Sequence, residues 1–328
     1  MNKYRWNIKD IRNQMNMDLK NPNILNNQDL LSSTKAFYET LFSAYDINRT
    51  VSCYTDYDDE SYEYKFPNLN SDALVLLKNK LGKINNIDVI DTSYYKLAIK
   101  LSNDDIISIA EEIIAQIPSK EILNEFKKLF YSSNQANIVF NKYNINPIHG
   151  ICTVDFNNNI PYIAIFRNNS VIDILCIIHE FFHSYIRKYE NSNFNKSPSN
   201  IYCESEGYFA NFITDYLSKK IFKEDLFSQT IYCDFNNFVV TAKTIMSNYI
   251  DDNEKGELVS DAFSYLVGLD LFSIYEKDPE KALFYLKKIS SLTGNNIEEE
   301  LLNNEMTFIS DEFKNIKRIM KKLKWQKI

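Results

Sequence analysis

The feature that most constrains this chain is one apolar helix that carries two histidines and a glutamate. Residues 170–189, SVIDILCIIHEFFHSYIRKY, place apolar side chains nearly all round a helix, so we expect it to be buried. His179, Glu180 and His183 lie inside it, and the chain has only 3 histidines. Imidazoles and a carboxylate are costly in an apolar setting without partners. The fold must therefore supply something for them to bind.

The spacing of the two histidines favours a metal ion as that partner. Residues four apart on a helix share a face, with Cβ atoms about 5–6 Å apart. Two such imidazoles can both reach one zinc ion at about 2.0–2.1 Å. Glu180 lies one position round the helix from His179, which suits a general base better than a ligand. The plainer alternative is a pair of satisfied core histidines, since the motif also occurs by chance.

A third ligand must come from another segment. The predicted helix 203–222 opens with Cys203, Glu204 and Glu206. Side chains two positions apart on a helix point in different directions, so only one of the two glutamates can face the metal. Cys203 is a weaker option as a soft ligand. Three protein ligands would leave one position open for water.

Composition favours a helix-rich, soluble chain. Only 6 Gly and 7 Pro occur in 328 residues, too few for the turns of an all-β sandwich, while 45% hydrophobic residues can fill a core. The net charge of −7 disfavours nucleic-acid binding, which depends on neutralising phosphates. No stretch approaches the roughly 20 apolar residues of a membrane span. No apolar leader follows the charged start, so we expect a cytoplasmic protein without a membrane span.

Apolar periodicity predicts helices along most of the chain and a small sheet in its middle. Two or three strands are expected within 137–166, a hairpin or loop at 51–66, and a loop at 190–202. Asn103 and Ser119 suit helix N-caps. The fold class is thus mainly α with a small β-sheet, in two parts, 1–135 and 136–328. Helices are predicted over 28–45, 71–81, 103–117, 119–131, 170–188, 203–222, 235–249, 257–276, 279–292, 296–303 and 310–324.

Pro161 bears on the place of its strand in the sheet. Proline cannot donate to a strand ladder, so its position near a strand start favours an edge strand. An edge strand with Pro161, Tyr162 and Ile163 would suit binding of an extended peptide by strand addition.

Several segments together resemble the M3 oligopeptidases, which include oligoendopeptidase F and thimet oligopeptidase. The resemblance covers roughly residues 146–305 and rests on Pro-Tyr-Ile at 161–163, the HEFFH helix, a second helix opening with Glu204, and FSYLVG at 263–268. It implies an M3-like zincin catalytic domain over 136–328. The helical N-terminal half, 1–135, would be reduced, since the chain is far shorter than typical members.

The resemblance also implies a role for each matched residue. His179, His183 and Glu204 correspond to ligands of one zinc ion, and Glu180 corresponds to the general base. Tyr265 corresponds to a tyrosine that donates a hydrogen bond to the substrate carbonyl as it becomes an oxyanion, a role a phenol near a metal can perform. The plainer interpretation of Tyr265 is a core aromatic.

Two departures from the family pattern are visible. Phe182 stands where members usually have Gly, which implies a bulkier channel wall beside the metal. The additional His and Tyr that contact substrate before Tyr265 have no clear counterpart. Tyr249 is a possible substitute, although a core aromatic at a helix end is the plainer interpretation.

The expected function is that of a zinc-dependent metalloendopeptidase acting on oligopeptides, with Glu180 activating a water at the metal. Three alternatives stay open: another gluzincin that cleaves proteins, a dedicated processing peptidase for one leader or signal peptide, and a non-catalytic peptide-binding module that kept the fold. Chelator-sensitive cleavage separates the enzymes from the module.

Overall fold

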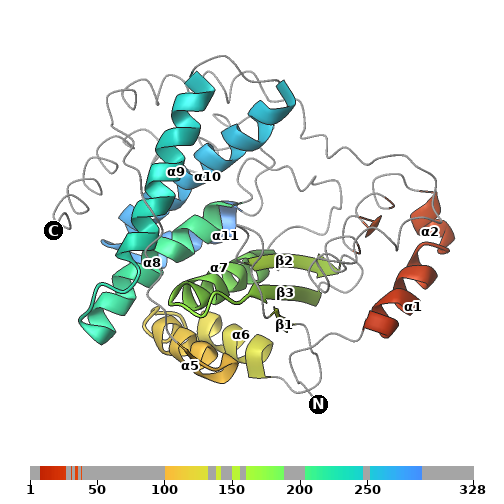
Figure 1. Cartoon of the computed structure of the whole chain (residues 1–328), viewed down its shortest axis with the longest axis horizontal. Helices are drawn as coiled ribbons and strands as arrows, with labels where there is room; N and C mark the ends of the chain where they lie inside the picture. Colours follow the sequence, from red (N-terminus) through yellow and green to blue (C-terminus); the bar gives the residue numbers. More distant parts are fainter. Residues whose placement is uncertain are drawn as a thin grey trace. The chain divides into compact units, whose positions relative to one another are not determined.

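The computed structural model describes residues 8–26, 31, 34–35, 38, 100–131, 138–141, 150–155, 160–187, 204–246 and 252–289. Helices dominate these residues, which also include one three-stranded sheet, and this confirms the predicted fold class (Figure 1). The elements are α1 (Ile8–Asp18), α2 (Pro22–Leu25), α5 (Asn103–Ile114), α6 (Lys120–Tyr131), β1 (Ile138–Asn141), β2 (Gly150–Asp155), β3 (Ile160–Phe166), α7 (Ile172–Arg187), α8 (Ser205–Phe222), α9 (Ser228–Met246), α10 (Asp252–Tyr275) and α11 (Pro279–Ile289).

Most helix predictions within the described residues are correct to within a few positions. Two helices begin earlier than predicted: α9 at Ser228 and not at 235, and α10 at Asp252 and not at 257. Helices α1 and α2 were not predicted. Outside the described residues, wholly or in large part, lie the segments predicted over 28–45, 51–66, 71–81, 190–202, 296–303 and 310–324.

The start of α5 corrects the predicted N-cap at Asn103. Ser102 caps the helix, because its Oγ accepts the N–H of Asp105 at 3.1 Å while the Asp105 carboxylate accepts the N–H of Ser102 at 3.0 Å. This reciprocal pair is a capping box. The Asn103 side chain instead accepts a hydrogen bond from Arg167.

The strand order β1-β3-β2 corrects the predicted edge position of Pro161. β3 is the central strand, parallel to β1 and antiparallel to β2. Among the described residues, the pairing of β3 with β1 begins at Ile163, and Pro161 is paired with Val154 of β2, so no described residue of β1 needs a backbone donor from Pro161. Strand addition along β3 at Ile163 is therefore excluded, since both of its sides are already paired.

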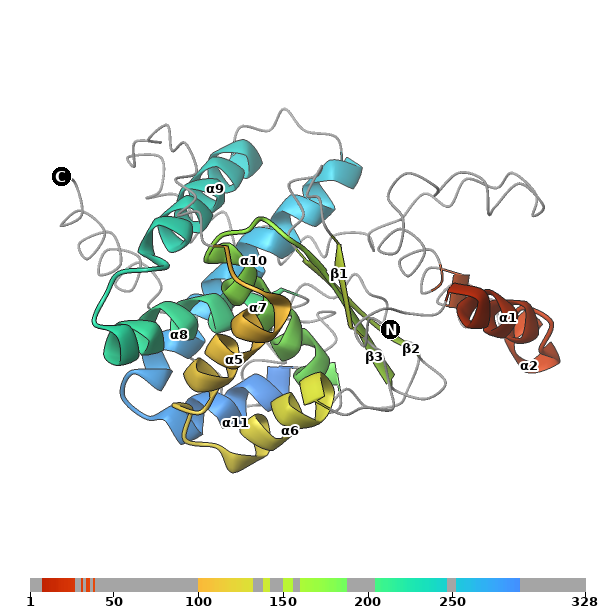
Figure 2. The same cartoon turned by 60° about the horizontal axis from the view of Figure 1, so that its bottom comes forward.

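The described elements belong to two compact units. The first contains α1, α2, the larger part of α5, α6, the sheet and α7. In it α7 packs on β2 and β3 (Figures 1 and 2), and Phe181 meets Phe126 of α6 at a ring distance of 5.1 Å. The residues from Val171 to Phe182 are buried except for His179, which is partly exposed, as the apolar pattern predicted.

The second unit contains α8, α9, α10 and α11, with α10 in contact with the other three. One stretch of the described chain, Leu258–Tyr275 in α10, is long and apolar enough to cross a membrane, but 83% of it is buried inside the fold. The predicted division of the chain into a helical part, 1–135, and a catalytic part, 136–328, stays a prediction.

Candidate metal centre

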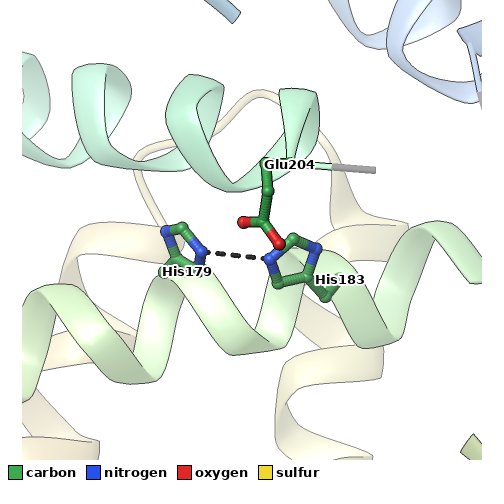
Figure 3. Close-up of side chains that lie close together, drawn as sticks. All are labelled: His179, His183 and Glu204. Atoms are coloured by element: carbon green, nitrogen blue, oxygen red, sulfur yellow. Dashed lines mark hydrogen bonds between the residues drawn. The ribbon is translucent and has the colours of Figure 1, made fainter. Parts of the chain in front are cut away.

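His179 and His183 lie one turn apart on α7, with their rings edge-on at an interplanar angle of 71°. Their Nε2 atoms are 3.0 Å apart and their ring centroids 4.7 Å apart (Figure 3). His183 is 6% exposed and His179 is partly exposed. At this separation either one ring donates to the other, or both nitrogens turn lone pairs toward a shared cation.

Glu204 completes the group from the start of α8. It is the N-cap residue, and its side chain makes no capping hydrogen bond to α8. One ligand atom from each of His179, His183 and Glu204 lies within 4.8 Å of the others, and Figure 3 shows the carboxylate pointing toward the imidazoles. Of the two glutamates left open by spacing, this group contains Glu204, while Glu206 is buried at 6% exposure on α8.

The geometry of these donors fits a zinc ion. Two nitrogens bound to one tetrahedral zinc at about 2.0–2.1 Å lie roughly 3.3 Å apart, close to the observed 3.0 Å. Two imidazoles and one carboxylate are also a donor set that catalytic zinc sites use, with a fourth position left for water or substrate.

Glu180 lies against the backbone of β2. A Cβ placed on Gly150 would lie only 2.6 Å from Glu180 Oε1 and 2.8 Å from Glu180 Cγ. A larger residue at this position would therefore require the Glu180 side chain, which is 6% exposed, or the strand to shift. Gly150 was not among the predicted site residues, although a glycine inside a predicted strand is a known sign of close approach.

Cys176 shares this contact, since its Sγ would lie 2.6 Å from the same Cβ. Burial raises the pKa of the Cys176 thiol well above its usual value, with further contributions from the charges of Glu180 and Asp173. The neutral thiol is a poor metal ligand, because thiolates are the ligand form. Cys203, the other cysteine considered, lies outside the described residues.

Tyr265 is 1% exposed and enclosed by aromatic rings. It stacks on Phe238 at 4.5 Å and meets Tyr208 and Phe212 edge-on at 5.0 and 5.5 Å. Its buried hydroxyl has no hydrogen-bond partner among the residues that the structure describes. Burial raises the pKa of Tyr265 well above its usual value, and the charges of Asp234 and Asp261 raise it further.

Tyr208 is a phenol near Glu204 that the sequence analysis missed. It lies four residues after Glu204 on α8, and its hydroxyl donates to Asp261 Oδ1. Burial raises the pKa of Tyr208 well above its usual value, and Asp261, Asp234 and Glu204 add to the rise. The i, i+4 spacing from Glu204 was the available signal.

The remaining predicted residues occupy varied positions. Ile163 is fully buried, whereas Pro161 and Tyr162 are partly exposed. Phe182 is fully buried and packs on Phe181 at a ring distance of 5.6 Å, so it fills the core and is not an exposed wall. Tyr249 lies outside the described residues.

Comparison with known proteins gives a likeness of fold. No protein-family model matches the chain, and no curated protein matches it. The crystal structure of a candidate oligoendopeptidase F from Bacillus anthracis strain Ames matches with a TM-score of 0.52 at 15% identity, covering 79% of this chain and 54% of that one. A candidate peptidase from Chlamydophila abortus matches with a TM-score of 0.53 at 12% identity, covering 90% and 61%. The chain thus spans less than two thirds of either protein and shares its fold.

Proposed function

We propose that the chain is a zinc-dependent metallopeptidase of the M3 type that hydrolyses peptide bonds in oligopeptides. The observation that carries the proposal is the convergence of His179, His183 and Glu204, whose ligand atoms lie within 4.8 Å of one another. The fold shared with two structures described as candidate peptidases supports a peptide as the substrate.

In this proposal the metal ligands, the base and the oxyanion donor are different residues of the chain. Zinc bound by the three ligands would supply Lewis-acid polarisation of the carbonyl and acidify a water. Glu180, the residue that follows the ligand His179 on α7, is the proposed base that takes the proton of the attacking water and passes it to the leaving amine. The Tyr265 hydroxyl, which has no partner within the described part of the chain, is the proposed donor to the developing oxyanion.

The peptide is proposed to bind along β2. β2 is the outer strand beside β3 in the described sheet, and its first residue, Gly150, touches Glu180. An extended peptide that pairs with an edge strand gains main-chain hydrogen bonds without depending on its side chains. This assignment replaces β3, whose central place excludes strand addition.

Metal analysis joined to a cleavage assay tests the proposal. Purified protein is expected to hold one zinc ion and to cleave a quenched fluorescent peptide library, with cleavage abolished by a chelator and restored by zinc. Glu180→Gln should keep the zinc and lose at least about 10²-fold in turnover, whereas His179→Ala should lose the zinc.

Two results would overturn the proposal. Full activity in Glu180→Gln would remove Glu180 as the base. Peptide binding without chelator-sensitive cleavage would favour a non-catalytic peptide-binding module.

A further inference from the structure

Helix α10 approaches the first turn of α8 at Gly268. A Cβ on Gly268 would lie 2.7 Å from Tyr208 Cβ, 2.9 Å from the Phe209 nitrogen and 2.9 Å from the Ser205 carbonyl oxygen. Two of these three atoms are backbone atoms of α8, which cannot rotate away as a flexible side chain can. Gly268 therefore sets the distance between α10 and the turn that follows Glu204.

One turn earlier on α10, Ser264 contacts Glu204 itself. The backbone N–H of Glu204 donates to Ser264 Oγ at 3.3 Å, and Ser264 is fully buried. Residues four apart on a helix share a face, so Ser264 and Gly268 together present one surface to the start of α8. Tyr208, on that same turn of α8, adds a hydrogen bond to Asp261 of α10.

We propose that Ser264 and Gly268 are positioning residues that hold Glu204 where it can bind the metal. The inference rests on the proposed metal site and concerns how its third ligand is fixed. Because the Glu204 side chain makes no capping bond, its own helix does not hold the carboxylate in place through a cap. Its backbone is held instead by the Ser264 hydroxyl and by the close approach at Gly268.

The close contact at Gly268 matters because a metal site tolerates only small displacements of its ligands. Ordinary van der Waals contact begins near 3.4 Å, so a Cβ at 2.9 Å from the Ser205 carbonyl oxygen forces that atom or α10 to move by several tenths of an ångström. Metal–ligand distances are held to within about 0.2 Å. A shift of that size at the first turn of α8 therefore misplaces Glu204.

Equilibrium metal affinity is the measurement that tests the proposal. Zinc binding to Ser264→Ala and Gly268→Ala is measured by competition with a chromophoric chelator, alongside the visible absorption of the cobalt-substituted proteins. We expect zinc affinity to fall about 10- to 100-fold in both variants, the range for groups that support metal ligands. The cobalt spectrum should shift, since it reports the ligand arrangement.

Ser273→Ala is the matched control. Ser273 is also a buried serine of α10, at 7% exposure, but its hydroxyl donates to the Leu269 carbonyl of its own helix. Its loss should leave zinc affinity unchanged to within about two-fold. Glu204→Ala marks the affinity expected when the third ligand is absent. Thermal unfolding of the metal-free proteins identifies any variant that fails to fold. If Gly268→Ala fails to fold, the zinc affinity of Ser264→Ala alone tests the positioning role.

The possible outcomes separate this inference from the proposed function. If the wild-type protein binds no zinc, the proposed function fails and the inference fails with it. If the wild type binds zinc and Glu204→Ala does not, but folded Ser264→Ala binds as tightly as wild type with an unchanged cobalt spectrum, the positioning role alone is wrong. An equal loss in Ser273→Ala would also overturn it.

Discussion

Gly150 offers a test of how the proposed base is held in place. Its Cα lies against Glu180, so Gly150→Ala must displace the carboxylate or the strand. A misplacement of about 1 Å at a catalytic group can cost about 10²-fold in rate. We expect kcat to fall about 10- to 100-fold while zinc stoichiometry stays at the wild-type value, as measured by peptide cleavage and metal analysis.

Cys176→Ala is the control for this change, because it alters the same contact without adding an atom beside Glu180. It should keep near-wild-type turnover. A Gly150→Ala protein with unchanged kcat would show that the carboxylate tolerates the displacement.

Tyr265→Phe separates the catalytic from the core interpretation of this tyrosine. Its hydroxyl is buried and has no partner among the described residues, so removing it should leave stability unchanged or raise it by up to about 1 kcal/mol. Loss of one oxyanion donor typically costs about 10²–10³-fold in kcat. We expect that loss, measured by cleavage kinetics, with zinc content and urea unfolding unaffected. Wild-type turnover would instead make Tyr265 an ordinary core aromatic.

At this scale the sequence predicts what local spacing determines. His179 and His183 converge because both lie on one helix, so the i, i+4 rule suffices. Gly150 and Ser264 act through segments distant in sequence. A glycine inside a strand signals a close approach but not its partner, and no local pattern marks the contact of Ser264 with Glu204. Tyr208 is intermediate, since its spacing from Glu204 was visible but its bond to Asp261 of α10 was not.

Among the elements, α7 depends on how its first turn is fixed to β3. Asp173, 1% exposed, accepts the backbone N–H groups of Asn168 and Asn169 at 2.7 and 3.0 Å and pairs with Arg167 at 2.8 Å. Asn169 adopts a positive φ of 51° in this turn. Asp173→Ala removes every one of these contacts and leaves the Arg167 charge, which is only 10% exposed, without its carboxylate.

We expect Asp173→Ala to lower the free energy of unfolding by about 3–5 kcal/mol, the range for breaking a buried pair. Urea denaturation measures the change. The control is Glu280→Ala, which removes an exposed acid from the first turn of α11 and should cost less than about 1 kcal/mol. Equal effects of the two substitutions would show that the Asp173 network does not hold α7.

Local sequence patterns predicted most of the helices but not the order of the strands in the sheet. Helix existence follows from apolar periodicity, and the buried face of α7 was predicted in this way. The predicted edge position of β3 was wrong. Proline is unfavourable in a strand only where a neighbouring strand needs its backbone donor, and the described residues of β1 pair with β3 from Ile163 onward. Which residues of β3 are paired on each side depends on the neighbouring strands, and the presence of Pro161 does not predict them.

For the whole molecule, a bound metal should appear as added stability. A ligand that binds only the folded state stabilises it by about 2.7 kcal/mol at one hundred times its dissociation constant. We expect zinc to raise the thermal midpoint of the wild-type protein and a chelator to reverse the rise. Glu204→Ala should show a much smaller rise, since it lacks one of the three ligands. An equal rise in both proteins would place the bound zinc elsewhere.

Alkaline pH should weaken the fold through its buried phenols. Tyr275, whose ring packs edge-on to Phe209 and Tyr216, has its pKa raised to about 12 by burial first and then by Tyr216. Its neutral form is favoured in the fold, so this stability is complete below pH of about 10, where the unfolded tyrosine is also neutral. It is lost as pH rises through about 12, by up to about 2.7 kcal/mol and by less where solvent reaches the hydroxyl.

Urea unfolding at successive pH values between these limits should therefore show a shallower decline in Tyr275→Phe than in wild type, because the variant cannot ionise there. Parallel declines would mean that Tyr275 ionises as readily in the fold as in the unfolded chain.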